Sequence, residues 1–384
     1  MVSSLMRPRG ASHYPSDQSF RFGIEEEYFL ARRGTMELAT ETPDALFEQL
    51  AGIDGNLERE LLQAQIEVAT KPHVYARDAC SELKRLRLAA ATAARDHGLS
   101  ILACGTHPAG NWRQSVQTQK PRYDDVMDSL QMLGHRNMVC GMHVHVEFPD
   151  PSRRIDVMHR ALPYIPLLLA LSTSSPFWES RLTGLKGYRL AAYDELPRTG
   201  LPDLFTDERE YQDYVDAMTR SGAIADSSHV WWSIRPAHSY PTLELRAPDC
   251  CTRIDDAIAI ASLYRVIIRH LYLNAEVNRG LDTVDRALAV ENKWRAQRYG
   301  ADSSFVSRDG AIPIAEFLER ICDLVAPDIE ALDCWDEIYH CRSILAEGTS
   351  ADAQLRIFRQ HERRGTAAAL REVSLWIANA TLAA

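Results

Sequence analysis

The sequence predicts an α+β protein in which helices cover one face of a β-sheet. Segments with the period-two alternation of strands lie in the first two thirds of the chain, whereas residues 255–380 show almost only helical periodicity. The 384 residues, 46% of them hydrophobic, are enough to bury a substantial core. We expect a flexible tail at residues 1–18 and a single domain at residues 19–384.

Composition narrows the classes of partner. The formal net charge is −10 and no run of Lys and Arg appears, so small molecules rather than nucleic acids are the expected partners. No membrane span of about 18 apolar residues and no signal peptide is visible, so the expected location is the cytoplasm. The eight cysteines show no C-x-x-C spacing, and we expect them to be reduced and mostly buried.

The first expected strand, Phe20–Leu30, carries paired acids. Its alternation puts Glu25 and Glu27 on one face, opposite Ile24 and Tyr28. Two like charges so close are tolerated best in solvent or around a cation. The strand is therefore either plainly exposed or part of a cation site.

The acids that follow, Glu60 and Glu67, are harder to place. A short helix is expected at Pro43–Leu50, and Glu58–Thr70 is compatible with a helix or a strand. The two acids share a face if the segment is helical, but not if it is one regular strand. Its end, Ile-Glu-Val-Ala-Thr, favours a strand that carries Glu67, and Glu60 would then return to the same side only through a bulge or turn.

Residues 139–148, Val-Cys-Gly-Met-His-Val-His-Val-Glu-Phe, are the most informative stretch. As a strand they place His143, His145 and Glu147 on one face and only apolar side chains on the other. Three side chains able to bind metal, in a row on an otherwise apolar element, indicate the wall of a site. The alternative is an edge strand with an exposed polar face.

Two later regions could serve the same site. Ser172–Pro202 holds Arg181, Lys186 and Arg189 among glycines and prolines, so it is either a mobile flap that carries cations over a substrate or an ordinary surface loop.

Beyond that loop, strands are expected at His229–Arg235 and Thr242–Arg246, and the second puts Glu244 and Arg246 on one face. These two side chains could simply pair, or they could serve a metal and a phosphoryl group.

Helical periodicity accounts for most of the remaining chain. The expected helices are Asp78–His97, Ile155–Leu171 with interruptions at its prolines, Asp207–Ser221, Asp255–Asn278, Val284–Tyr299, Pro313–Leu324, Pro327–Ala346, Ala351–Arg363 and Thr366–Ala380. We expect those of the C-terminal third to cover the sheet and, in part, to offer a partner interface. No Walker A or G-x-G-x-x-G sequence appears, so any nucleotide must be held by metals and side chains.

The polar strands together predict a metal site. Several strands present acids or histidines on one face, and carboxylates with at most one imidazole per metal suit Mg²⁺ or Mn²⁺ better than zinc. Hard cations bind phosphates, so these strands, with Arg235 and Arg246, indicate a sheet that holds the polyphosphate of ATP while its γ-phosphoryl group moves.

These residues also carry a family resemblance. Gly141-Met-His-Val-His resembles the Gly-Met-His-x-His signature of glutamine synthetases, and two more of their motifs occur in order, as Glu25-Glu-Glu27 and Glu244-Leu-Arg246-Ala-Pro-Asp249. More closely, Phe22-Gly-Ile-Glu-Glu-Glu-Tyr, Cys104-Gly-Thr-His-Pro-Ala, Gly141-Met-His-Val-His and Trp232-Ser-Ile-Arg-Pro look like the carboxylate–amine ligases of the second glutamate–cysteine ligase family. The resemblance spans roughly residues 20–380.

The resemblance implies a glutamine synthetase-like catalytic fold, a curved and mostly antiparallel sheet with helices on its outer face. It implies ATP-dependent joining of a carboxylate such as L-glutamate to an amine such as L-cysteine, with Mg²⁺ or Mn²⁺, in a possible homodimer. The implied metal ligands are Glu25, Glu27, Glu60, Glu67, His143 and Glu244. The implied nucleotide contacts are His145, Arg235 and Arg246, of which Arg246 would touch the transferring phosphoryl group and Arg235 the ATP or acyl phosphate. Glu147 is outside the motif.

Three rival functions remain compatible with the residues. A metal-dependent hydrolase also uses His-x-His with scattered acids, although its zinc would require more histidines. A phosphagen-kinase-like enzyme would phosphorylate a guanidine. A binding protein without catalysis is the third, but unused carboxylates converging on one place would lower stability.

Overall fold

The centre of the computed structural model, which describes residues 20–51 and 56–383, is a seven-stranded antiparallel sheet. The strand order is β2-β3-β1-β5-β9-β8, and β4 pairs with the last residues of β1. The strands are β1 (Phe22–Arg32), β2 (Asn56–Arg59), β3 (Gln65–Ala69), β4 (Leu99–Leu102), β5 (Met142–Glu147), β8 (Ile234–Pro236) and β9 (Thr242–Leu245). Two hairpins lie outside the sheet: β6 (Phe177–Trp178) with β7 (Arg181–Leu182), and β10 (Ser304–Ser307) with β11 (Gly310–Pro313).

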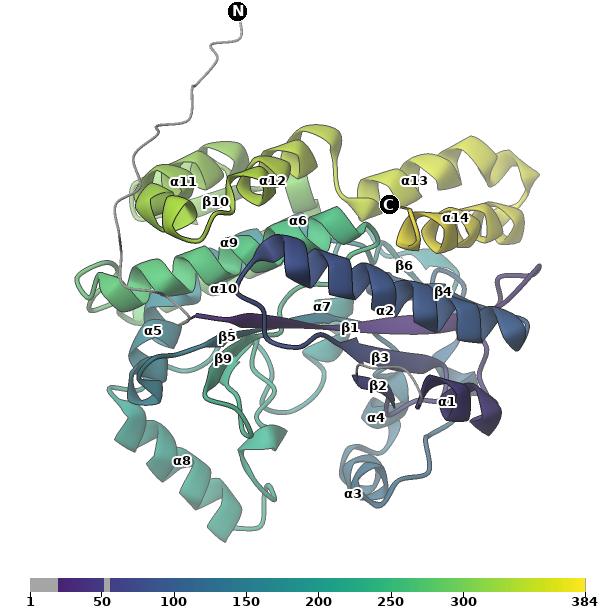
Figure 1. The fold of residues 1–384 in the computed structure, drawn as a ribbon, viewed down its shortest axis with the longest axis horizontal. Helices are drawn as coiled ribbons and strands as arrows, with labels where there is room; N and C mark the ends of the chain where they lie inside the picture. Colours follow the sequence, from purple (N-terminus) through teal and green to yellow (C-terminus); the bar gives the residue numbers. More distant parts are fainter. Residues whose placement is uncertain (1–19, 52–55, 384) are drawn as a thin grey trace, which may run out of the picture.

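Helices cover one face of the sheet, as predicted (Figure 1). α2 (Ala76–Asp96) and α9 (Ile254–Leu273) lie on that face, and the C-terminal helices pack around them: α11 (Ile314–Ala331), α12 (Trp335–Glu347), α13 (Ser350–His361) and α14 (Thr366–Thr381). On the other face α8 (Glu208–Arg220) stands at one edge, and α3 (Pro121–Leu130) with α4 (Met132–Arg136) at the opposite edge. The remaining helices are α1 (Asp44–Leu50), α5 (Arg154–Ala161), α6 (Ile165–Ser172), α7 (Tyr188–Tyr193) and α10 (Thr283–Tyr299).

A buried ion pair fixes which face of β1 carries which acid. Glu26 is fully buried and accepts hydrogen bonds from Nε and Nη2 of Arg87 on α2 at 2.8 and 2.6 Å. Arg87 also donates to backbone carbonyl groups just before α9 and at the end of α14. Because side chains alternate along a strand, holding Glu26 on the helical face directs Glu25 and Glu27 to the open face.

The segment Ser172–Pro202, interpreted from the sequence as either a mobile flap or an ordinary surface loop, is in large part packed into the fold. Thr173–Ser175 are completely buried, and the hairpin β6–β7 and helix α7 follow them. Lys186, one of the three cations of the possible flap, pairs with Asp352 at 2.5 Å. Glycines and prolines here mark tight turns within a packed segment, because the polar groups of this segment find partners elsewhere in the fold.

Some predicted boundaries are also wrong. Residues 229–235 do not form one strand, because the Asp226 side chain accepts a hydrogen bond from the backbone N–H of Ser228 and caps a 3₁₀ turn. Only Ile234–Pro236 pairs with β9. Helix α9 begins at Ile254 and ends at Leu273, earlier than the predicted Asn278.

The predicted break before Pro327 does not occur, because α11 continues through this proline to Ala331. The chain turns at Asp333 instead, where φ is 50°. A proline removes one helical hydrogen bond, but Asp328 beside it is buried and accepts a hydrogen bond from His270 of α9 at 2.8 Å. Packing of this face against α9 therefore outweighs the local preference of proline.

All eight cysteines are free thiols and seven of them are buried, as predicted. Over residues 20–51 and 56–383, no helix has both the length and the apolar character needed to cross a lipid bilayer.

Candidate active site

Strand register brings the predicted acids together on the open face of the sheet. Glu27 of β1 lies opposite Glu67 of β3, and Glu25 of β1 lies opposite His143 of β5. Side chains directly opposite each other in antiparallel strands are about 5 Å apart at Cβ. Residues from three separate stretches of sequence therefore meet without any loop having to position them.

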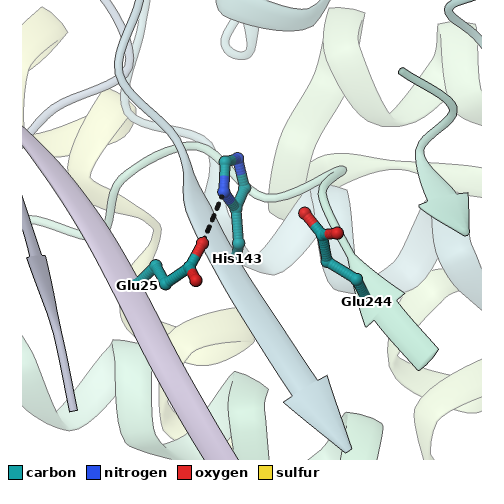
Figure 2. A group of neighbouring side chains, drawn as sticks. All are labelled: Glu25, His143 and Glu244. Atoms are coloured by element: carbon teal, nitrogen blue, oxygen red, sulfur yellow. Dashed lines mark hydrogen bonds and ion pairs between the residues drawn. The ribbon is translucent and has the colours of Figure 1, made fainter. Parts of the chain in front are cut away.

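The first group of possible metal ligands is Glu25, His143 and Glu244, shown in Figure 2. They come from β1, β5 and β9, and one ligand atom from each lies within 4.8 Å of the others. Nδ1 of His143 is 3.3 Å from Oε2 of Glu25, while its Nε2 is buried without a hydrogen-bond partner.

The second group is Glu27, Glu60 and Glu67, which also lie within 4.8 Å of one another. Glu60 follows the end of β2, so a turn between β2 and β3 returns it to the face that carries Glu67. The prediction that Glu60 reaches this face only through a turn is confirmed. Oε2 of Glu27 also accepts a hydrogen bond from the N–H of Gly141 at 2.5 Å.

The two groups differ in electrostatics. Burial raises the pKa of Glu25, but hydrogen bonds from His143 and His145 outweigh it and hold this pKa below its usual range. Burial and the charge of Arg246 lower the pKa of His143 to about 4, so the imidazole is neutral at pH 7. The first group therefore presents an ionised carboxylate beside a neutral imidazole, which is the form that binds metal.

The second group holds acids that repel one another. Burial and the negative charge of Glu60 raise the pKa of Glu27 to about 7. The same causes, with the charge of Glu25, raise the pKa of Glu67 well above its usual value. A divalent cation among these acids would remove the repulsion and restore their ionised forms.

Two arginines flank Glu244 near the β8–β9 edge of the sheet. Arg235 of β8 lies opposite Glu244 and donates to it from Nε at 2.8 Å, and Arg246 donates from Nη1. Burial raises the pKa of Glu244, but the charges of both arginines outweigh it and hold the pKa well below its usual range. Arg246 also donates to the hydroxyl of Tyr193 at 3.1 Å.

His145 lines the same cavity and lies two residues beyond His143 on β5. It pairs with Glu244 in register, its Nδ1 is 2.9 Å from the hydroxyl of Thr242, and its ring meets that of Tyr240 edge to face. Burial lowers its pKa, but hydrogen bonding to Glu25 outweighs this, so the pKa is raised.

One cavity of about 760 Å³ contains all nine predicted site residues in its wall. These residues are Glu25, Glu27, Glu60, Glu67, His143, His145, Arg235, Glu244 and Arg246. Glu147, which lies outside the family motif, is not in the cavity wall and pairs with Arg21 at 2.7 Å.

The donor atoms fit two hard cations. An octahedral Mg²⁺ has ligands at about 2.1 Å, so opposite ligands lie about 4.2 Å apart, and each group already lies within 4.8 Å. Five carboxylates and one imidazole make up the two groups, a set typical of Mg²⁺ or Mn²⁺. The unpartnered Nε2 of His143 supports the same interpretation.

Sequence reasoning missed the role of Arg189, which lines the same cavity. It is 1% exposed on α7, and its Nη1 donates to the carbonyl oxygens of Arg246 and Ala247 at 3.2 and 3.4 Å. Its guanidinium also lies 5.6 Å from the ring of Tyr193 on the same helix, but its hydrogen-bond partners are distant in sequence, so mainly its charge could have drawn attention to it.

A Cβ added at Gly141 would lie 2.0 Å from Nη2 of Arg189, so the guanidinium would have to shift. We therefore expect Gly141→Ala to displace Arg189 and to lower the free energy of unfolding by about 1–3 kcal/mol, the usual range for overpacking. Urea denaturation of both proteins would measure this. Equal stability would mean that the guanidinium moves aside freely.

A family model described as glutamate-cysteine ligase family 2 matches residues 21–372. A protein of Bradyrhizobium diazoefficiens is 53% identical over 94% of this chain and 84% of its own, and one of Rhodospirillum rubrum is 43% identical over 91% and 92%. Both are provisionally named glutamate–cysteine ligase 2.

Among solved structures, the glutamate–cysteine ligase of Francisella tularensis in complex with AMP has the same fold. It superposes with a TM-score of 0.71 at 14% identity, over 95% of this chain and 90% of that one. The predicted fold class is therefore confirmed.

Proposed function

The chain belongs to glutamate-cysteine ligase family 2, and from that premise we propose that it is an ATP-dependent ligase joining the γ-carboxylate of L-glutamate to the amine of L-cysteine. ATP would first phosphorylate the carboxylate, and the amine would then displace phosphate, giving ADP and phosphate. The observation that carries the proposal is the meeting of two metal-ligand groups and two arginines in one cavity.

Each wall of the cavity has a proposed task. Glu25, His143 and Glu244 would hold one cation and Glu27, Glu60 and Glu67 the other. Bound Mg²⁺ or Mn²⁺ supplies positive charge that neutralises the phosphate oxygens. Arg246 would contact the transferring phosphoryl group, and Arg235 the ATP, since both guanidinium groups line the cavity beside Glu244.

The nucleotide is proposed to enter at the β8–β9 side. His145 and Tyr240 form a polar and aromatic wall there, next to Arg235. The AMP complex of the Francisella tularensis ligase, which shares the fold, supports a nucleotide site in this cavity. Burial of the reacting groups would keep water from the acyl phosphate.

A metal-dependent hydrolase is the second candidate, but the ligand atoms favour the ligase. Each group has at most one imidazole, whereas a zinc site that activates water usually has several nitrogen ligands. A phosphagen-kinase-like activity would share the metals and ATP, and only its products would differ.

Product analysis tests the proposal directly. Purified protein is incubated with ATP, Mg²⁺, L-glutamate and either L-cysteine or one of several other amines, and ADP, inorganic phosphate and product masses are measured. We expect ADP and phosphate in equal amounts, and only when both a carboxylate and an amine are present. ATP cleavage independent of the amine would indicate a hydrolase, and ADP without inorganic phosphate would indicate a kinase.

A further inference from the structure

Arg189 is a buried cation that forms no ion pair with a carboxylate in the described part of the chain. Its guanidinium makes hydrogen bonds only to the backbone carbonyl groups of residues 246 and 247, and its Nε is buried without any partner. The charges of Glu27 and Asp249 act on it, but neither carboxylate lies within the 4.0 Å of an ion pair.

Such an arrangement is unfavourable unless an anion completes it. A buried charge usually has an oppositely charged partner, because burial removes its hydration and an unpaired charge is then unfavourable. Arg189 is also held in place. Its backbone N–H donates to the hydroxyl of Ser175 at 2.9 Å, and its Nη1 donates to the carbonyl oxygen of Arg246, just after β9. The guanidinium is therefore a rigid donor at the wall of the cavity.

Its position separates it from the nucleotide end of the site. Nη2 of Arg189 lies against Gly141, whose N–H donates to Glu27 of the second metal group. Arg235, His145 and the rest of the nucleotide wall belong to β5, β8 and β9, on the side of the first group. Since the attacking and leaving oxygens are in line during phosphoryl transfer, the body of the donor must lie opposite the nucleotide, which is the side of Arg189.

Building on the proposed function, we propose that Arg189 binds the second, non-reacting carboxylate of the donor and thereby selects dicarboxylic donors. A guanidinium matches a carboxylate through two parallel hydrogen bonds, and the unpartnered Nε and the adjacent Nη2 are the pair suited to this contact. Arg246 and the cations would serve the reacting carboxylate, so the two ends of the donor are recognised by different groups.

The wild-type protein gives the first test. L-Glutamate and 4-aminobutyrate carry the same γ-carboxylate, but 4-aminobutyrate lacks the α-carboxylate. We expect ADP release with ATP, Mg²⁺ and L-cysteine to show kcat/KM at least about 10²-fold higher for L-glutamate, the size expected for one buried charged contact. Equal kcat/KM for the two donors would overturn the proposal.

The variant Arg189→Gln gives the second test. Its kcat/KM for L-glutamate should fall by about 10²-fold, whereas that for 4-aminobutyrate should change less than about 3-fold. If Arg189 had a purely structural role or contacted the phosphoryl group, the substitution would lower kcat/KM equally for both donors. That result would refute the proposal. The matched control is Arg342→Gln on α12, which breaks the ion pair with Glu319 outside the cavity and should leave both values unchanged.

A binding measurement keeps this test separate from the proposed function. Calorimetry with Mg²⁺ and a non-hydrolysable ATP analogue should show L-glutamate binding to the wild type and not to Arg189→Gln. If no donor and amine give ADP, the ligase proposal fails while this measurement still decides the role of Arg189. Equal L-glutamate binding by both proteins, or none by the wild type, would overturn the assignment.

Discussion

Replacing Glu67 with glutamine should stabilise the metal-free protein at pH 8 and at the same time abolish most metal-dependent ATP turnover. Glu67 lies opposite Glu27 and near Glu60 and Glu25, and burial together with these charges raises its pKa well above its usual value. Glutamine removes one of the repelling charges but also one metal ligand. We expect at least about a 10²-fold loss of turnover, because a metal ligand rather than a supporting residue is removed.

The effect on stability should depend on pH. A carboxyl group with a raised pKa in the folded state contributes stability below its unfolded pKa of about 4.5, and this contribution is lost as the pH rises through the folded value. Glu67→Gln should therefore change the free energy of unfolding less at pH 5.5, nearer the unfolded pKa, than at pH 8. At pH 8 the substitution should increase the free energy of unfolding by about 1 kcal/mol or more.

Urea denaturation at both pH values, without and with Mn²⁺, measures this. Mn²⁺ should stabilise the wild type more than Glu67→Gln, because only the wild type keeps the complete second group of ligands. The matched control is Glu147→Gln, which removes a carboxylate from the same face of the sheet but outside the cavity. A destabilised Glu67→Gln at pH 8, or a fully active one, would remove Glu67 from the metal site.

Most residues of the candidate site could be predicted from the sequence, because side chains alternate between the two faces of a strand and this alternation is visible within a few residues. The spacing of Glu25 with Glu27, and of His143 with His145, determines their shared faces before any tertiary contact forms. Which acid meets which imidazole depends on strand register, and register is a long-range property. The pairing of Glu25 with His143 therefore became visible only in the fold.

Arg189 shows what local patterns could not reveal. The glycines and prolines around it indicated a surface flap, yet Arg189 is buried and donates to the carbonyl groups of Arg246 and Ala247, just after β9. Pro327 wrongly predicted a helix break for the same reason. The residue beside it, Asp328, forms a buried hydrogen bond with His270 of another helix, α9, and α11 continues. In both places tertiary contacts outweighed a local signal.

Replacing Glu244 with glutamine should have the opposite effect on stability from Glu67→Gln, although turnover should again fall by at least about 10²-fold. Glu244 is 2% exposed and is the shared partner of the partly buried guanidinium groups of Arg235 and Arg246. Removing one partner of a buried ion pair typically lowers stability by about 3–5 kcal/mol. The sequence already allowed Glu244 to pair with Arg246, but its contact with Arg235 depends on the register of β8 and β9.

The pH dependence distinguishes the two variants further. Since the pKa of Glu244 is held well below its usual range, its contribution to stability is present above the unfolded pKa of about 4.5 and disappears only as the pH falls through the folded value. Glu244→Gln should therefore be less stable than the wild type at both pH 5.5 and pH 8 in urea denaturation. Glu319→Gln, which breaks an ion pair of Arg342 on the outer helices, should lower stability by no more than about 1 kcal/mol. If Glu244→Gln were as stable as this control, Glu244 could not be the anion that holds both arginines at the site.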